Sequence, residues 1–403
     1  MLKDRSWIDA APTARLIAAL DAGGIDFRFV GGAVRDGLLG RPVSDIDVAT
    51  PAKPETVMQA IEAAGLKAVA TGLKHGTVTA IADRRHFEIT TLRRDIETDG
   101  RHAVVAFTDD WREDAARRDF TMNALYADRD GKITDFFGGE DDGLAGRVRF
   151  IGDAEERIKE DALRILRFFR FHAHYGQGAL DADGLAAATK LAAMIDSLSG
   201  ERIRVEVFKT LRATDPGPVW QAMIDAGVMA HVVPAAGRVA GLEKMIALEK
   251  VLGLSPDPMR RLAALTGAPS ADLSAALKSR LRLSNRDADH FAAFAGQQDR
   301  LRRLGRRKLG QALYGAEPDW LRDAAMLSAV ETGQPDTAAL ADLNRFIGDW
   351  VEPRFPLAGA DLQEAGMKPG PEMGRLLTEL EDWWIGRDFA PDREACLARL
   401  QEL

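Results

Sequence analysis

Residues 29–50 read FVGGAVRDGLLGRPVSDIDVAT, and the rest of the chain is best understood from this stretch. Asp45 and Asp47 lie two positions apart and alternate with Ile46 and Val48. Along a strand, residues i and i+2 point to the same face, so both carboxylates project together while the apolar pair enters a core. Two neighbouring carboxylates repel each other unless a cation lies between them, and oxygen ligands suit Mg²⁺. An ordinary surface turn is the alternative interpretation.

The first half of the stretch favours phosphate binding. Gly31 and Gly32 allow the backbone to approach a ligand, and backbone N–H groups in such a turn attract phosphate. Arg35 can offer a fork of donors to phosphate, although Asp36 can instead be present to orient Arg35. A phosphate-binding turn upstream of a metal-binding carboxylate pair indicates nucleotidyl transfer. Glu88 is a candidate third metal ligand, or alternatively an exposed charge on a strand.

Composition limits the class of protein. At 403 residues the chain is too long for one compact core and predicts about two to four domains. It has no apolar run near about 18 residues, so we expect no membrane span. Residues 1–10 are too polar for a signal peptide, and Cys396 is the single cysteine, so neither a disulfide within the chain nor a cysteine-based zinc site is expected. A cytoplasmic location follows as an expectation, and nothing implies a protein partner.

The net charge of −8 argues against a nucleic-acid partner, but the charge is unevenly distributed. Residues 260–308 contain twelve Lys or Arg and four Asp or Glu. A basic face can bind nucleic acid whatever the mean charge, and a solvated helix is the alternative. The candidate RNA-binding residues lie at the end of this segment: Arg300, Arg302, Arg303, Arg306, Arg307 and Lys308.

Periodicity predicts two kinds of structure along the chain. Residues 1–140 form a mixed region, with helices over 13–22, 51–64 and 114–125, strands over 27–30, 45–49, 66–71, 76–82, 86–91 and 132–139, and a mobile loop over 93–107. After residue 147 nearly every segment has helical periodicity. The predicted class is therefore α+β, with a small mixed sheet followed by an all-helical array.

Two further motifs carry candidate ligand contacts. In RRDFTMNA at 117–124, a helix would place Asp119 and Asn123 on one face, where an acid and an amide could receive ribose hydroxyls, with Arg118 beside them. In EDALR at 160–164, Asp161 and Arg164 would share a helix face and present acceptors and donors in one plane, as the pairing edge of cytosine or adenine requires. Ordinary ion pairs on helix surfaces are the alternative for both motifs. ERIRVE at 201–206 is expected to brace the helix before it.

Together these motifs resemble the bacterial class II tRNA nucleotidyltransferase and poly(A) polymerase family, within the polymerase β-like nucleotidyltransferase superfamily. The match rests on GGAVRD and DID in 29–50, RRDFTMNA at 117–124, ITDFFGG at 133–139, EDALR at 160–164, ERIRVE at 201–206 and a tail segment at 355–377. The resemblance implies a nucleotidyltransferase head at 1–140 and three helical parts: a neck at 141–212 with the base template, a basic tRNA-binding body at 213–310 and a tail at 311–403.

The resemblance also implies an activity and residue roles. CTP and ATP would donate nucleotides to the 3′ end of tRNA. Asp45 and Asp47 would hold two Mg²⁺ ions, and Gly31, Gly32 and Arg35 would bind the nucleotide phosphates. Asp119 would receive the ribose, and Asp161 with Arg164 would pair with the base. Glu160 would orient Arg164, and Arg167 would stack against or line the base pocket.

Which branch of the family the chain represents is a separate question. Addition of the full CCA sequence is the expectation, with poly(A) polymerase, CC-only and A-only addition as alternatives. Residues 93–107 resemble the family's flexible loop but lack an expected aromatic residue. An inactive RNA-binding homologue is the alternative from another class, and the intact pair of Asp45 and Asp47 argues against it. A transferase acting on a small molecule or a protein is a third alternative, which the long helical extension disfavours.

Overall fold

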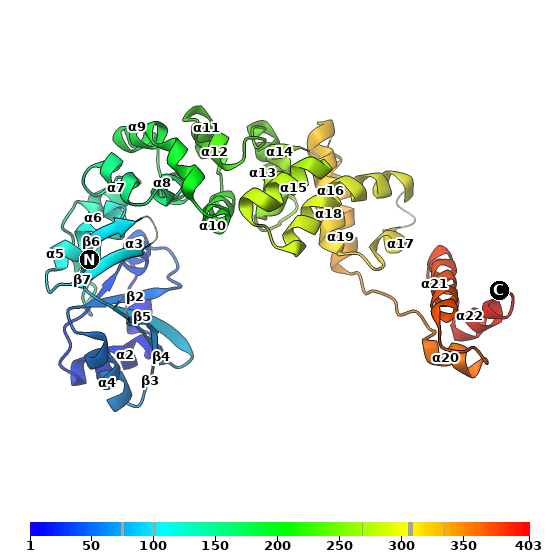
Figure 1. Ribbon diagram of the computed structural model, residues 1–403, viewed down its shortest axis with the longest axis horizontal. Helices are drawn as coiled ribbons and strands as arrows, with labels where there is room; N and C mark the ends of the chain where they lie inside the picture. The colour runs from blue at the N-terminus through cyan, green and yellow to red at the C-terminus, as the bar shows by residue number, and fades with distance from the viewer. Residues whose placement is uncertain (74–75, 100–101, 268, 305–308, 334) are drawn as a thin grey trace. The chain divides into compact units, whose positions relative to one another are not determined.

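The computed structural model describes residues 1–73, 76–99, 102–267, 269–304, 309–333 and 335–403 (Figure 1). They form two compact units, Met1–Pro234 and Ala235–Leu403. Every strand of the described ranges lies in the first unit, so the predicted α+β class is confirmed. None of the described helices is both long and apolar enough to cross a membrane. The boundaries predicted at 140, 212 and 310 divide the chain more finely than these two units and stay a prediction.

A seven-stranded mixed sheet forms the centre of the first unit, in the order β3-β4-β5-β2-β1-β8-β9. Strands β2 and β5 run parallel, while the other neighbours are antiparallel. The strands are β1 (Arg28–Val30), β2 (Ile46–Thr50), β3 (Lys67–Gly72), β4 (Thr77–Ala82), β5 (Arg85–Thr91), β8 (Tyr126–Ala127) and β9 (Ile133–Thr134). The pairing of β2 with β5 aligns Asp47 with Glu88, and the pairing of β1 with β8 aligns Phe29 with Ala127.

One face of this sheet is covered by helices α2 (Ala11–Ala22) and α4 (Pro54–Ala63) (Figure 1). The core between them contains Ile46 and Val48 of β2, both at most 2% exposed. Because side chains alternate along a strand, Asp47 points away from this core. The predicted alternation at this strand is confirmed, and it directs the carboxylate toward the opposite face of the sheet.

Three predictions of secondary structure were wrong in part. The loop expected over 93–107 is an antiparallel hairpin of β6 (Arg93–Asp99) and β7 (His102–Phe107), with 100–101 outside the described residues. The valines at positions 104 and 105 of β7 are β-branched, which favours strand structure. The strand expected over 132–139 is only β9, because the Asp135 carboxylate accepts from the backbone N–H groups of Phe137 and Glu140 and turns the chain into α6 (Gly139–Leu144).

The helix expected over 114–125 is also shorter. Helix α5 (Trp111–Ala116) begins where the Asp110 side chain accepts from the Arg112 backbone N–H, and it ends at Ala116. The chain then extends so that Phe120, fully buried, bridges to Phe150, before one 3₁₀ turn over Thr121–Asn123. Burying this aromatic side chain is worth about 2–3 kcal/mol, more than continuing an exposed helix by a turn.

The rest of the first unit is helical. Its helices are α1 (Ser6–Asp9), α3 (Gly32–Leu39), α7 (Ala154–Glu160), α8 (Leu163–Tyr175), α9 (Ala182–Lys190), α10 (Gly200–Leu211), α11 (Gly217–Asp225) and α12 (Val228–Val232). Helix α10 braces α8 as predicted, because Glu206 forms an ion pair with Arg170 at 2.6 Å. Arg202, also on α10, bonds to Asp161 at 2.7 Å, just before α8 begins.

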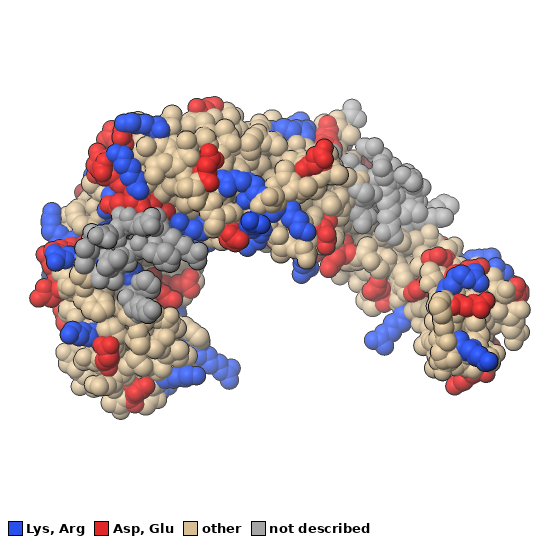
Figure 2. Space-filling view, viewed as in Figure 1, with Lys and Arg blue, Asp and Glu red and all other residues tan. Residues whose placement is uncertain are grey.

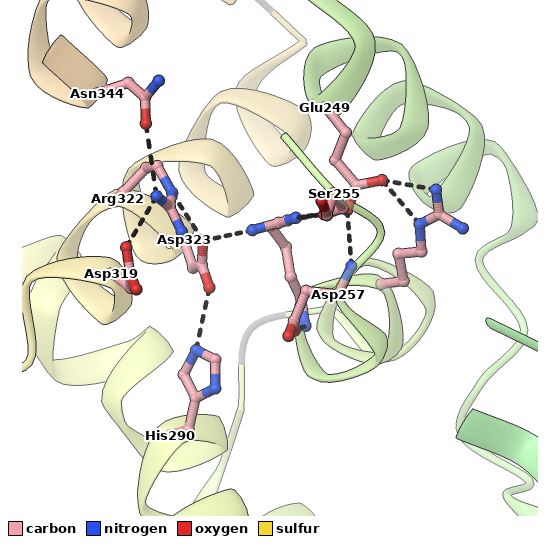
Figure 3. Close-up of polar contacts among 10 residues, drawn as sticks. Glu249, Ser255, Asp257, His290, Asp319, Arg322, Asp323 and Asn344 are labelled. Carbon is pink, nitrogen blue, oxygen red and sulfur yellow. Dashed lines mark hydrogen bonds and ion pairs between the residues drawn. The ribbon is translucent and has the colours of Figure 1, made fainter. Parts of the chain in front are cut away.

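In the described residues of the second unit, all the regular secondary structure is helical. Its helices are α13 (Val239–Val251), α14 (Pro258–Thr266), α15 (Ala271–Leu281), α16 (Asn285–Leu304), α17 (Leu309–Leu313), α18 (Pro318–Thr332), α19 (Thr337–Gly348), α20 (Gly359–Glu364), α21 (Pro371–Gly386) and α22 (Arg393–Leu400). A buried ion-pair network joins α13, α14 and α18 (Figure 3). Arg260 is 2% exposed and contacts both Glu249 and Asp323 at 2.8 Å, while Arg261 contacts Glu249 at 2.7 Å.

This network corrects the count of basic residues over 260–308. Arg260 and Arg261 are paired inside the unit, so they do not belong to a basic surface. The face in Figure 2 shows basic and acidic side chains interspersed on the described part of the second unit. Arg306, Arg307 and Lys308 lie outside the described residues, and Arg300, Arg302 and Arg303 are placed only as positions on α16. Their contact with RNA stays a prediction.

A group of metal-ligand type also lies in this network. Asp257, His290 and Asp323 have one ligand atom each within 4.8 Å of one another, the one such group of three among the described residues. Asp323, however, is already bound by Arg260 and Arg322, and Asp257 caps α14 through the Arg260 backbone N–H. A dication there would lie close to two guanidinium groups, which repel it. We therefore interpret the group as part of the ion-pair network and not as a metal site.

Candidate active site

One charged cavity of about 760 Å³ in the first unit collects most of the predicted site residues. Its walls come from the turn before α3, the start of β2, the segment after α5, and helices α8 and α10. The predicted residues that line it are Gly31, Gly32, Arg35, Asp45, Asp47, Arg118, Asp119, Asn123, Asp161, Arg164 and Arg167. Glu88 and Glu160 do not line it. Predicted residues as far apart in sequence as Gly31 and Arg167 thus share one site.

The two aspartates lie at the start of β2. Asp45 is exposed and precedes the strand, whereas Asp47 is half-buried and aligns with Glu88 across the parallel β2–β5 pair. Burial, together with the charges of Glu88 and Asp45, raises the pKa of Asp47 to about 6, against the lowering effect of Arg118. The charges of Glu88 and Asp45 thus disfavour the ionised form of Asp47, and a divalent ion bound by the carboxylates would relieve this repulsion.

This raised pKa predicts a pH dependence of metal binding. A metal ligand must be ionised, so apparent affinity for Mg²⁺ or Mn²⁺ should fall as pH decreases through about 6. The pKa of Asp47 is about 6 in the metal-free fold and 3.8 when the group is unperturbed, as in the unfolded chain. Protonation of Asp47 therefore stabilises the metal-free fold. Ionised Asp47 therefore destabilises that fold above about pH 6, and the penalty disappears as pH falls toward about 4.

Calorimetric titration with Mn²⁺ between about pH 5 and 8 checks this prediction. The expected loss approaches tenfold for each pH unit below about 6. In Asp47→Asn the remaining dependence should lack this inflection. An affinity of the unmodified protein that stays constant across this range would contradict the assignment.

The turn predicted to bind phosphate depends on Gly31. Its backbone has φ of 72° and ψ of −125°, a conformation that residues with a Cβ avoid. A Cβ there would also lie 3.5 Å from Nη1 of Arg118, so the guanidinium passes close to the turn. Helix α3 begins at the next residue, Gly32, and its N-terminus faces the same cavity. Backbone N–H groups and a nearby cation therefore occur together, as phosphate binding requires.

Arg35 is held in place on several sides. It is 6% exposed, and both carboxylate oxygens of Asp36 accept from it at 3.0 Å. Its Nη1 donates to Asn123 at 2.7 Å, and its Nη2 donates to the hydroxyl of Tyr175 at 2.6 Å. The proposed orienting role of Asp36 is therefore realised, and Arg35 still lines the cavity.

Asp119 is fixed by four donors. Its Oδ2 accepts from Nε and Nη2 of Arg167 at 2.7 and 2.5 Å, and its Oδ1 accepts from Asn123 at 3.0 Å and from the Phe120 backbone N–H at 2.8 Å. Arg167 is the main influence that lowers the pKa of Asp119, against burial. Asp119 and Asn123 thus meet as predicted, although no α-helix joins them. Arg167, expected at the base, contacts this acid.

Asp161 and Arg164 both face the cavity, but they do not share a helix as predicted. Asp161 is extended between α7 and α8 and accepts from Arg202 at 2.7 Å and from the Leu163 backbone N–H at 3.1 Å. Arg164 donates to Glu160 at 2.5 Å, which is the orienting contact expected for Glu160. Its Nη1 also donates to the Arg157 carbonyl at 2.9 Å. The acid and the guanidinium are each braced independently.

Sequence reasoning missed Asp114, a buried acid that organises the arginines of the RRDFTMNA motif. It accepts from Arg117 at 2.9 Å, Arg118 at 3.1 Å and the Tyr126 hydroxyl at 2.7 Å. These partners hold its pKa at about 2 in spite of burial, with Arg118 the largest of them. The spacing DAARR, with the acid three and four residues before the arginines, was the available signal. Tyr175 had no such signal.

Comparisons with known proteins agree with these features. Residues 27–149 match the family model described as Poly A polymerase head domain, and residues 179–237 match the one described as Probable RNA and SrmB- binding site of polymerase A. The chain is 35% identical to the CCA tRNA nucleotidyltransferase 1, mitochondrial, of Mus musculus over 391 residues, covering 94% of this chain and 87% of that protein. It is 31% identical to the CCA-adding enzyme of Streptococcus sanguinis, covering 96% of each.

A solved structure gives the same result for the fold. The Bacillus stearothermophilus CCA-adding enzyme in complex with CTP matches with a TM-score of 0.76 and 29% identity, covering 98% of each chain. The resemblance inferred from the motifs is therefore confirmed. The chain belongs to the family of CCA-adding tRNA nucleotidyltransferases and poly(A) polymerases.

Proposed function

We propose that this chain adds CCA to the 3′ end of tRNA, using CTP and ATP and releasing pyrophosphate. The observation that carries the proposal is the single cavity that joins an aspartate pair, a glycine turn and an acid–guanidinium pair. These groups correspond to the metal, the phosphates and the base of a nucleoside triphosphate. The named relatives, which act as CCA-adding enzymes, match over nearly the whole chain.

The acidic pair fits a divalent metal, as the family requires. The raised pKa of Asp47 reflects its burial and the neighbouring charges of Glu88 and Asp45, and both aspartates offer oxygen ligands. We assign two Mg²⁺ ions to Asp45 and Asp47, with Glu88 as a third carboxylate beside them. Bound there, Mg²⁺ supplies Lewis acidity toward the attacking hydroxyl and charge neutralisation for the leaving pyrophosphate.

The chain's own residues bind and orient the reactants. The turn of Gly31 and Gly32, with Arg35 and Arg118, holds the triphosphate, although the Gly31 N–H itself donates to the Leu125 carbonyl at 3.1 Å. Asp119 and Asn123 face the ribose. In-line attack of the tRNA 3′-hydroxyl on the α-phosphorus needs these groups to be fixed before reaction, and their many internal bonds provide this rigidity.

Base choice is assigned to Asp161 and Arg164. Cytosine and adenine each present an amine donor beside a ring acceptor, which a carboxylate and a guanidinium can satisfy. Both groups have independent braces, Arg202 and Glu160, so they remain in place while the bound base changes. A fixed pair that accepts two bases is what addition without a nucleic-acid template requires.

Binding of tRNA is assigned to the helical parts of the chain. Arg300, Arg302, Arg303, Arg306, Arg307 and Lys308 are the proposed contacts to the phosphates of the acceptor arm. Such contacts give affinity that depends on salt and little on sequence. We place the head at 1–140, the neck at 141–212, the body at 213–310 and the tail at 311–403, and the protein in the cytoplasm.

Incubation with a series of tRNA primers tests the proposal. Transcripts that lack the last three, two or one nucleotides are given CTP and ATP separately, and the added nucleotides are mapped. We expect CTP to extend the first two primers and ATP to extend only the third, by one residue. Long tails from ATP alone would instead indicate a poly(A) polymerase. Activity confined to one nucleotide would indicate a CC-only or A-only enzyme, and no extension of any primer would indicate an inactive RNA-binding protein.

A further inference from the structure

A chain of side-chain contacts among residues that line the cavity begins and ends on the same helix, α8. Arg167 of α8 donates to Asp119 at 2.5 Å, and Asn123 donates to the same acid at 3.0 Å. Arg35 then donates to Asn123 at 2.7 Å and to Tyr175 at 2.6 Å. Because Tyr175 is the last residue of α8, the chain of contacts closes on the helix where it began.

Tyr175 makes several kinds of contact at its end of α8. Its ring lies 4.1 Å from the guanidinium carbon of Arg35 and 4.5 Å from that of Arg41, and it stacks on Phe171 at 5.8 Å. Arg41 also donates to the carbonyl of His174 at 2.8 Å. Burial raises the pKa of the Tyr175 hydroxyl, so it stays protonated and neutral near Arg35. The phosphate-binding turn is thus held against the end of α8.

The three described side chains that accept hydrogen bonds from Arg35 belong to different elements, and this distinguishes Tyr175 from the other two. Asp36 belongs to the same helix as Arg35, and Asn123 belongs to the neighbouring 3₁₀ turn. Tyr175 alone among the side-chain acceptors described for Arg35 comes from α8, the helix that carries Arg164 and Arg167. A phenylalanine would keep the ring contacts and remove this acceptor.

We propose that Tyr175 is a positioning residue that fixes Arg35 for the triphosphate and thereby ties the phosphate-binding turn to the base-reading helix α8. The inference rests on the proposed function because it assigns Arg35 to the phosphates. It assigns no contact between Tyr175 and the nucleotide. Loss of the hydroxyl should therefore weaken recognition of the phosphates and spare recognition of the base.

Binding of three ligands to Tyr175→Phe tests the proposal without tRNA. CTP and inorganic triphosphate are titrated by calorimetry with Mg²⁺, and cytidine by NMR. We expect the variant to bind CTP and inorganic triphosphate about fivefold more weakly, the effect of one hydrogen bond, and to bind cytidine as the unmodified protein does. In primer extension, KM for CTP and ATP should rise by a similar factor with little change in kcat. Equal weakening of cytidine and triphosphate, or unchanged triphosphate affinity, would overturn the proposal.

Two further variants separate this role from a structural one. Tyr314→Phe removes a matched hydroxyl, bonded to Glu381 at 2.5 Å in the second unit, and should leave all three affinities unchanged. In Arg35→Lys the fork is absent, so adding Tyr175→Phe should cost no further triphosphate affinity, and an additive loss would contradict action through Arg35. If the unmodified protein binds CTP but does not extend tRNA, the proposed function fails while these binding results still decide the role of Tyr175.

Discussion

Replacing Asp47 by asparagine is expected to reduce nucleotide incorporation by about a thousandfold or more while tRNA binding survives. The amide keeps the shape of the carboxylate but loses its charge, so the metal ions at Asp45 and Asp47 lose most of their attraction. Metal-ion stabilisation of a transition state is worth several kcal/mol, and each about 1.4 kcal/mol changes the rate tenfold. Asp45→Asn should act in the same direction, since its charge lies in the same cluster.

The measurement compares single-turnover incorporation of CTP with tRNA affinity from filter binding. Asp26→Asn is a matched control, because Asp26 is an exposed aspartate just before β1 and does not line the cavity. It should behave as the unmodified protein in both assays. Incorporation by Asp47→Asn at an undiminished rate would remove the metal assignment. A parallel loss of tRNA affinity would show that the change had disturbed the fold instead.

The alternation around this residue was predictable because it depends on strand geometry alone. Ile46 and Val48 are buried and the intervening aspartate faces the other way, as a period of two requires. The neighbourhood of Asp47 was less predictable. Glu88 comes into register through the parallel pairing of β2 with β5, which depends on the topology of the whole sheet. Sequence could therefore name Glu88 as a candidate but could not place it.

Helix boundaries failed where local and tertiary preferences compete. The segment from Asp114 onward has helical spacing, yet the chain leaves the helix at Arg117 so that Phe120 enters the core. Asp161 likewise lies between two helices, where Arg202 binds it. Phe120 pairs with Phe150 and Asp161 with Arg202, so each contact joins residues about 30 to 40 positions apart. A local sequence pattern therefore does not predict either contact. The family resemblance supplied expected roles for these residues but not their partners.

The second large effect is expected for Arg164→Ala, which should impair the choice between CTP and ATP more than it weakens tRNA binding. Removing the guanidinium takes away the donors of the acid–guanidinium pair, while Glu160 loses one of its two arginine partners and keeps Arg157 at 2.8 Å. A hydrogen bond to a charged group is worth about 1.5–3 kcal/mol, so the ratio of kcat/KM for the correct to the incorrect nucleotide should fall about 10- to 100-fold.

The ratio is measured on primers that lack one or two nucleotides, with each triphosphate supplied alone. Arg129→Ala is the control, because this exposed arginine pairs with Asp21 and does not line the cavity, so nucleotide choice should not change. Arg164 also donates to the backbone carbonyls of Arg157 and Arg117, so truncation could shift α8 itself. A shift of the helix would lower incorporation of both nucleotides equally, whereas loss of a base contact lowers only the preference between them. Unchanged selectivity at reduced rate would therefore assign Arg164 to bracing α8 and leave Asp161 as the residue that reads the base.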